Sequence, residues 1–103
     1  MIENQHIEFK RSWKDEYLQY ISGFANANGG TLYIGLNDDG TVCGIKDATK
    51  LLANLPNQIF QTMGILSEVN IHTENEKDYI SVHVDAATQP ISYHAVQALH
   101  CKK

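Results

Sequence analysis

The segment that most constrains the fold spans residues 24–40 and reads FANANGGTLYIGLNDDG. An apolar helical face ends at its start, and the two glycines that follow Asn28 suit the positive φ of a helix C-cap. Residues 31–34 then predict a buried strand. The pair Asp39-Gly40 predicts a tight turn into a second strand over residues 41–45. The segment therefore predicts a helix followed by a central hairpin.

Periodicity on both sides of this segment supplies further elements. Residues 7–10 alternate apolar and polar side chains, as in a short strand with Ile7 and Phe9 facing inward. Apolar residues recur at helical spacing over residues 17–25 and predict the buried stripe of the first helix. Residues 69–74 and 80–84 alternate in the same way as residues 7–10 and predict an antiparallel hairpin with one buried face.

A second helical region is expected between these strands. Asp47 predicts its N-terminus, and Gly64 predicts its end. Pro56 suits the first turn of a helix better than a helix interior, so we expect a break near residues 54–56. The whole pattern predicts an α+β fold in a single domain, with a mostly antiparallel sheet and two or three helices packed on it.

Charge and composition exclude several classes of protein. The chain has 103 residues and a net charge of -4, which argues against a nucleic-acid grip spread over the whole surface but leaves room for a local basic patch. Two cysteines without CxxC spacing indicate free thiols in a reducing compartment. The N-terminus carries charges where a signal peptide needs an apolar core, and no apolar run could span a bilayer. We expect a cytoplasmic protein with no membrane contact.

Three carboxylates are candidate metal ligands. Glu8 lies in the first predicted strand, Glu3 precedes it by five residues, and Asp38 lies in the central turn beside Asp39. Divalent cations such as Mg²⁺ or Mn²⁺ prefer carboxylate oxygens. Residues 3 and 8 of a continuous strand would point to opposite faces, so a shared site needs a backbone bend between them. Alternatively, Glu8 is an exposed strand residue paired with Lys10, and Asp38 only stabilises its turn.

Basic and aromatic residues gather after the first strand. Lys10, Arg11 and Lys14 could neutralise phosphates, and Trp13 offers a stacking surface for a base. The alternative is a solvated strand end, with Trp13 packed as a lid on the first helix. These four residues are the candidate nucleic-acid contacts.

The segments IEFKRS, SGFANANGGTLYIGLNDDGTVCGI and QPISYH together resemble the Schlafen-type AlbA-like domain, also called the divergent AAA-type DNA-binding domain. The resemblance covers nearly the whole chain. It implies a nucleic-acid-binding domain over residues 1–94. Residues 95–103 do not match the family's usual aromatic strand ending in Arg and a Gly-Ser pair, so they are expected to form a divergent C-terminal tail.

The resemblance implies two kinds of activity. In the eukaryotic Schlafen branch, the domain forms a metal-dependent endoribonuclease acting on structured RNA such as tRNA. The positions of its three carboxylates look like Glu3, Glu8 and Asp38 here, which implies Mg²⁺ or Mn²⁺ as cofactor. Many bacterial members are instead described as DNA-binding or ATP-binding modules beside regulatory domains.

We therefore expect a nucleic-acid-binding domain, with RNA favoured over DNA and a candidate endoribonuclease site. A non-catalytic DNA- or ATP-binding module of a transcriptional regulator is the main alternative, and a protein-interaction domain is the third. The eukaryotic Schlafen enzymes use two such domains to enclose RNA. A single copy would therefore need to form a homodimer or bind weakly.

Overall fold

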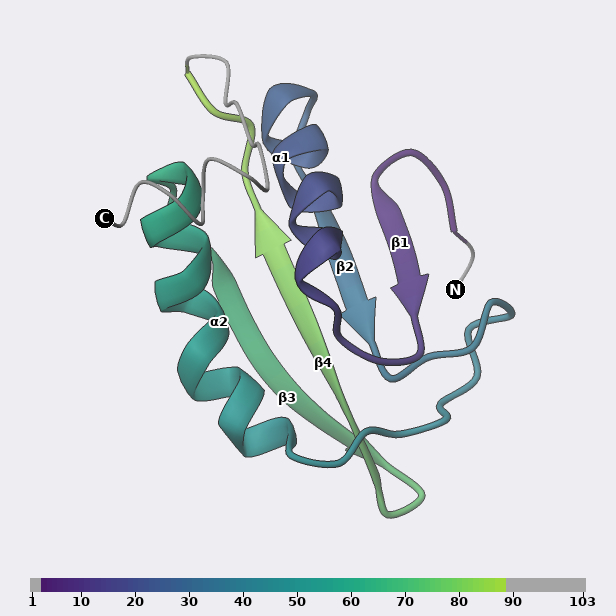
Figure 1. Ribbon diagram of the computed structural model, residues 1–103. Coiled ribbons are helices and arrows are strands. Elements are labelled where there is room, and N and C mark those ends of the chain that lie inside the picture. The colour runs from purple at the N-terminus through teal and green to yellow at the C-terminus, as the bar shows by residue number, and fades with distance from the viewer. Residues whose placement is uncertain (1–2, 89–103) are drawn as a thin grey trace.

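In the computed structural model, a four-stranded sheet carries both of its helices on one face (Figure 1). The structure describes residues 3–88. The elements in chain order are β1 (Ile7–Lys10), a 3₁₀ turn η1 (Asp15–Tyr17), α1 (Leu18–Asn26), β2 (Gly30–Ile34), α2 (Ala48–Met63), β3 (Glu68–Glu74) and β4 (Lys77–Val84). The predicted tail over residues 95–103 and its boundary at residue 94 lie outside the described residues.

The strand order is β1-β2-β4-β3. β1 runs parallel to β2, whereas β4 is antiparallel to both β2 and β3. The sheet is therefore mixed, with two of its three pairings antiparallel. This arrangement confirms the predicted α+β class and the hairpin formed by β3 and β4.

The core lies between the sheet and the two helices. Its members are apolar side chains at the helical and strand spacings expected from the sequence: Leu18, Ile21, Phe24, Leu32, Ile34, Ala48, Leu55, Ile59, Met63, Ile80, Val82 and Val84. Burial of these side chains is the main source of stability, since each large apolar side chain contributes about 1.5–3 kcal/mol when removed from water.

The end of α1 follows the prediction from the double glycine. Gly29 has a φ of 88°, and its N–H donates to the carbonyl oxygen of Phe24 at 2.8 Å. That hydrogen bond satisfies one of the carbonyls left unpaired at the helix C-terminus. Gly30 then starts β2, where a Cβ would lie only 2.5 Å from Cδ1 of Phe24 and 2.8 Å from the carbonyl oxygen of His6.

The second strand predicted over residues 41–45 is wrong. Those residues form a loop in which a single bridge joins Leu36 to Val42. The central strand β2 already pairs with β1 on one side and β4 on the other, so no edge remains for a hairpin partner. Gly35, with a φ of 108°, turns the chain away after β2. The tight turn itself forms, with Gly40 at a φ of 88°.

The break predicted at Pro56 is also wrong, because α2 continues through it. Proline removes one helical hydrogen bond and crowds the preceding turn. Leu55 and Ile59, on either side of Pro56, are both fully buried in the core, at 0% exposure. Packing of this face outweighs the local cost. Gly64 ends the helix in the left-handed region, as predicted.

A row of rings crosses the face of the sheet opposite α1 and α2. Phe9 of β1 contacts Tyr33 of β2, Tyr33 contacts Tyr79 of β4, and Tyr79 stacks on His72 of β3 with 4.9 Å between ring centroids. Phe9 is 1% exposed, so its predicted burial holds, on the face away from the helices. Cross-strand aromatic pairs of this kind stabilise a sheet.

The helices are short relative to a bilayer. Within residues 3–88, none combines the length and apolar character that crossing a membrane would need.

Candidate nucleic-acid interface

The four candidate nucleic-acid contacts separate into different environments. Lys10 turns toward the helices: its Nζ lies 3.3 Å from Oε2 of Glu8 and about 5 Å from the ring centres of Tyr17 and Tyr20. Partial burial acts to lower the pKa of Lys10, but hydrogen bonds to Tyr20 and Glu8 and their charges outweigh it and raise that pKa. Lys10 therefore has internal partners that already stabilise its charge.

Arg11 and Trp13 lie in a pocket of about 500 Å³. One wall comes from the connection after β1, and the other comes from the loop before α2 and the first turns of that helix. Its polar and aromatic lining consists of Arg11, Ser12, Trp13, Lys46, Asp47, Lys50 and Asn54. In Figure 1 both walls lie at the same end of the sheet. Lys14 does not line the pocket.

Lys46 and Lys50 are the residues that sequence reasoning missed. They flank Asp47, which occupies the predicted N-cap position of α2. Lys46 precedes the N-cap and Lys50 lies in the first turn of α2, so no helical spacing relates their side chains. Only the folded chain brings Lys46 and Lys50 to the pocket that Arg11 lines.

The position of Trp13 is fixed by Asp15. Oδ1 of Asp15 accepts the indole N–H at 3.0 Å and an amide N–H of Gln58, from α2, also at 3.0 Å. Tyr17 meets the indole ring at 82°, an edge-to-face contact. Trp13 also packs against the core, in line with the alternative interpretation of this residue as a lid. The ring is therefore held in one place while it borders the pocket.

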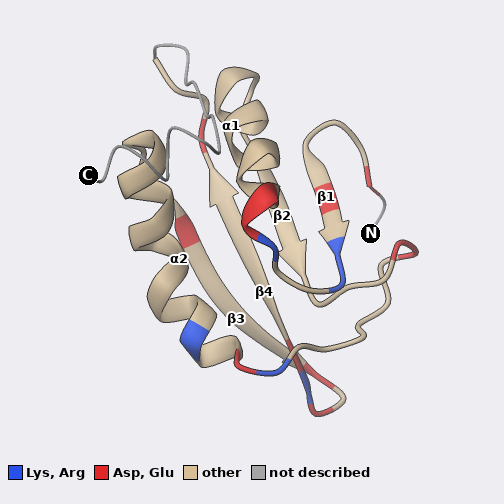
Figure 2. Cartoon of the chain, in the orientation of Figure 1, with Lys and Arg blue, Asp and Glu red and all other residues tan. Residues whose placement is uncertain are grey.

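The pocket carries an excess of positive charge. Within residues 3–88, none of the cations Arg11, Lys46 and Lys50 forms an ion pair, and Asp47 is the one carboxylate residue among the lining side chains. Figure 2 shows separate blue segments at the end of β1, before α2 and on its first turns, and the pocket joins these segments. The side chain of Asp47 does not cap α2, so the positive end of the helix dipole adds to the charge. The arrangement favours an anionic ligand.

The bend required between Glu3 and Glu8 is present. Asn4 and Ile7 exchange two backbone hydrogen bonds of 3.1 Å, which folds the chain back at residues 5–6. The carboxylate of Glu3 then accepts the N–H of Phe9 at 2.8 Å, at the outer edge of β1. This contact places Glu3 next to the strand residue that follows Glu8.

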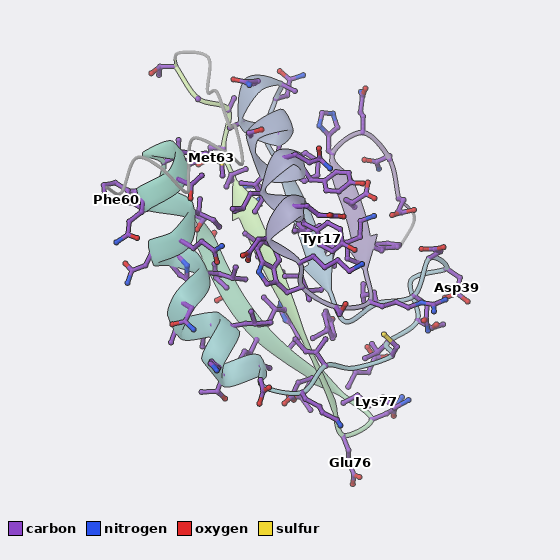
Figure 3. All side chains as sticks on the ribbon, in the orientation of Figure 1. Tyr17, Asp39, Phe60, Met63, Glu76 and Lys77 are labelled. Carbon is purple, nitrogen blue, oxygen red and sulfur yellow. The ribbon has the colours of Figure 1, made fainter. Side chains whose placement is uncertain are left out.

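The three predicted metal ligands do not gather into one group. Glu8 is paired with Lys10, as in the alternative interpretation of this residue. Asp38 is exposed in the turn, beside Asp39, which Figure 3 shows on the loop after β2. Among residues 3–88, no three His, Cys, Asp or Glu side chains lie close enough to share an ion. As arranged, these carboxylates do not fit a Mg²⁺ or Mn²⁺ centre, and the metal site stays a prediction.

Asp39, rather than Asp38, stabilises the turn. Its Oδ1 accepts the backbone N–H of Thr41 at 3.0 Å and the hydroxyl of Thr41 at 2.6 Å. These hydrogen bonds lower the pKa of Asp39, since they favour the ionised carboxylate. The side chain of Asp38 is exposed to solvent. Two residues earlier, the N–H of Leu36 donates to the carbonyl oxygen of Lys10, so the start of this loop lies beside the end of β1.

A family model described as Schlafen, AlbA_2 matches residues 3–102. The chain belongs to this family. Two solved structures resemble this AlbA_2 domain. The N-terminal domain of a Nitrosomonas europaea protein, described as related to the ATP-dependent DNA helicase RecG, is 25% identical with a TM-score of 0.71, and the match covers 90% of this chain and 72% of that one.

The DIP2311 protein of Corynebacterium diphtheriae is 20% identical with a TM-score of 0.70. The match covers 86% of this AlbA_2 domain but only 19% of the Corynebacterium chain, so the likeness concerns the fold alone.

Proposed function

We propose that this AlbA_2 domain binds nucleic acid. The phosphates of the nucleic acid contact the pocket between the β1–η1 connection and α2. The observation that carries the proposal is the group of three cations, Arg11, Lys46 and Lys50, without carboxylate partners among the described residues of an acidic chain. Unpaired cations repel one another and cost stability unless an anion joins them. Trp13 beside them adds an aromatic surface.

Two further observations support a nucleic acid rather than another anion. First, the chain belongs to the Schlafen AlbA_2 family, and the sequence resemblance to that family implies nucleic-acid binding. Second, a solved domain of similar fold comes from a protein described as related to a DNA helicase. Phosphate neutralisation by Lys and Arg releases condensed counterions, so even three contacts contribute useful affinity at low salt.

The test is binding of fluorescently labelled RNA and DNA, single-stranded and duplex, followed by anisotropy at low salt. The double variant Lys46→Gln/Lys50→Gln should lose most of its affinity. Lys77→Gln is a single-charge control at the β3–β4 turn (Figure 3): Lys77 is not among the lining residues, although its side chain lies beside Gly44, which is. The proposal fails if no nucleic acid binds, or if the double variant binds as tightly as the wild type. In this proposal RNA binds more tightly than DNA, and a single copy binds weakly unless it forms a homodimer.

Metal-dependent cleavage of structured RNA is a second, finer candidate function. It draws support from the chain reversal at residues 5–6, which brings the carboxylate of Glu3 to the N–H of Phe9, the residue after Glu8, and from the family membership. Glu8 is paired with Lys10, so its variant must keep the shape of the side chain. Glu8→Gln and Asp38→Asn meet that condition.

The cleavage test incubates tRNA with Mn²⁺ or Mg²⁺ and with the purified domain. Cleavage that depends on the ion, that Glu8→Gln and Asp38→Asn abolish, and that Glu76→Gln retains would support the endoribonuclease. Glu76 is an exposed turn residue at the tip of the β3–β4 hairpin (Figure 3). Equal background cleavage by all four proteins would contradict it. Retention of DNA that a chelator leaves unchanged would instead support the non-catalytic DNA-binding module.

A further inference from the structure

We propose that the pocket receives one unpaired nucleotide, its base stacked on Trp13, so that the domain selects single-stranded over duplex nucleic acid. This inference rests on the proposed function and deepens it, because it names the form of nucleic acid that the same site accepts.

The first support is the preorganised indole ring. Asp15 accepts the indole N–H of Trp13, and the same carboxylate oxygen accepts an amide N–H of Gln58, so one residue joins Trp13 to α2. The ring contact of Trp13 with Tyr17 is edge-to-face at 82°, not a parallel stack. A rigid ring loses little conformational entropy when a base stacks on it.

The second support is the size of the pocket. A volume of about 500 Å³ lies within the range of small-molecule sites, roughly 300–1,000 Å³, which take a ligand the size of a nucleotide. Bases inside a duplex are stacked and paired, and they reach a pocket only after extrusion from the helix. A single strand has no such cost, so it should occupy the pocket at lower concentration.

The third support is how charged and polar groups are placed around Trp13. Arg11 precedes it on one wall, and Lys46 and Lys50 lie on the other, so phosphates on both sides of a bound nucleotide could each meet a cation. The hydroxyl of Ser12 and the amide of Asn54 also line the pocket and can hydrogen-bond to a base edge or sugar. This combination of stacking ring, cations and neutral polar groups suits a nucleotide unit better than phosphate alone.

Intrinsic fluorescence provides a direct readout, because Trp13 is the only tryptophan of the chain. The probes are a short oligothymidylate, an abasic strand of the same length, a duplex of the same length, and free thymidine monophosphate. The oligothymidylate should quench Trp13 fluorescence and bind about tenfold or more tightly than the abasic strand, from the usual strength of base–aromatic stacking. Free thymidine monophosphate should also quench and should compete with the strand.

Variants of Trp13 separate stacking from packing, with binding followed by anisotropy of a labelled strand. Trp13→Phe keeps an aromatic ring and should bind within a few fold of the wild type. Trp13→Leu keeps apolar bulk against the core and should bind the oligothymidylate about tenfold or more weakly, with its affinity for the abasic strand unchanged. Phe60→Leu is the matched control: Phe60 is 52% exposed on α2 (Figure 3) and does not line the pocket, so its loss should leave both affinities unchanged.

The outcomes distinguish this inference from the proposed function. Equal affinity for the oligothymidylate, abasic strand and duplex, with no quenching, would overturn the unpaired-nucleotide inference and leave nucleic-acid binding intact. Absence of binding by every strand would overturn both. Tighter binding of the free monophosphate than of the strand would overturn single-strand selection and make a free nucleotide the ligand of the pocket.

Discussion

Single polar residues in this domain are tied to structural partners more often than the sequence suggests. Lys10 is shared between Glu8 and the rings of Tyr17 and Tyr20, and Asp15 joins Trp13 to α2. Among residues 3–88, Lys46 and Lys50 have no ion-pair partner, and they are the better candidates for binding a ligand. At the residue scale, freedom from internal contacts is the more useful sign of function.

Two glycines should respond in opposite directions to the same change. Gly30→Ala should lower the free energy of unfolding by about 1–3 kcal/mol, the usual cost of overpacking, since its Cβ would clash with the ring of Phe24 and the backbone of His6. Gly23→Ala should raise it by about 0.5–1 kcal/mol, because Gly23 lies inside α1 with open space around it. Urea denaturation measures both. A stable Gly30→Ala protein would contradict the packing described for β2.

The raised pKa of Lys10 predicts a pH-dependent contribution to stability. A group whose pKa is higher in the folded than in the unfolded state stabilises the fold when the pH is below its unfolded pKa, which is 10.5 for Lys10. This stabilisation is lost as the pH rises through the pKa of the folded state. Wild type should therefore be more stable than Lys10→Gln at neutral pH. The difference should shrink above pH 10.5, when urea denaturation is repeated in alkaline buffer.

Lys14→Gln supplies the control for this pH effect, because Lys14 is exposed. Its stability difference from the wild type should be small at neutral pH. A Lys10→Gln difference that stays constant through the alkaline range would show that the contacts of Lys10 with Glu8 and Tyr20 do not favour its charged form.

At the scale of elements, α2 is held by its buried face rather than by its sequence propensity. Pro56 interrupts the hydrogen-bond ladder, yet Leu55 and Ile59 keep both halves on the core. Helices in proteins commonly depend on tertiary packing in this way.

Replacement of the proline should therefore stabilise the domain. Pro56→Ala restores a backbone N–H and removes the clash with the preceding turn, which together cost about 3 kcal/mol in a helix interior. Proline also lowers the conformational entropy of the unfolded chain. Its replacement raises that entropy, which reduces the gain in the free energy of unfolding by about 0.4–1 kcal/mol. We expect a net increase of about 2 kcal/mol in calorimetry or urea denaturation, against little change for the exposed Gln61→Ala. A less stable Pro56→Ala protein would show that the rigidity of proline matters more than the lost hydrogen bond.

Local signals allowed most of these elements to be predicted. The glycine stop after α1, the turn at Gly40 and the β3–β4 hairpin depend on neighbouring residues and appear as expected. The fate of residues 41–45 depends on which strands occupy both edges of β2, and the continuity of α2 depends on what Leu55 and Ile59 contact. Those facts arise from residues far apart in the sequence, so local patterns could not supply them.

The candidate site shows the same division. Arg11 and Trp13 could be predicted from one short basic and aromatic segment. Lys46 and Lys50 lie more than thirty residues later and join them only because α2 begins beside the β1–η1 connection. The bend before β1 was required by the spacing of Glu3 and Glu8, and it is present. The pairing of Glu8 with Lys10 was the alternative that the sequence offered, whereas the hydrogen bond from the N–H of Phe9 to Glu3 could not be predicted from spacing.

At the scale of the whole molecule, charge is unevenly distributed. The chain has a net charge of -4, while its pocket gathers three cations against one carboxylate residue. A nucleic-acid strand would therefore be attracted to the pocket and repelled by the rest of the surface. This charge distribution favours binding at one defined position over diffuse association.

Salt dependence should report this small contact number. Each neutralised phosphate of a single strand contributes about -0.7 to the slope of log K against log salt, so three contacts predict a slope of about -2. The Lys46→Gln/Lys50→Gln variant should retain a slope of about -0.7. Anisotropy titrations over a series of salt concentrations measure both slopes. Equal slopes for the two proteins would show that phosphates contact other residues.

The chain reversal at residues 5–6 has a consequence for aggregation. The N–H groups of Ile7 and Phe9 at the outer edge of β1 are occupied by the carbonyl of Asn4 and the carboxylate of Glu3. An open strand edge recruits strands from other chains, and natural proteins block such edges. A protein trimmed to begin at Gln5 would lack both acceptors, and the N–H groups of Ile7 and Phe9 would face solvent. Glu3 and Asn4 thus block the edge of β1 and disfavour fibre-like self-association, whatever chemistry the domain performs.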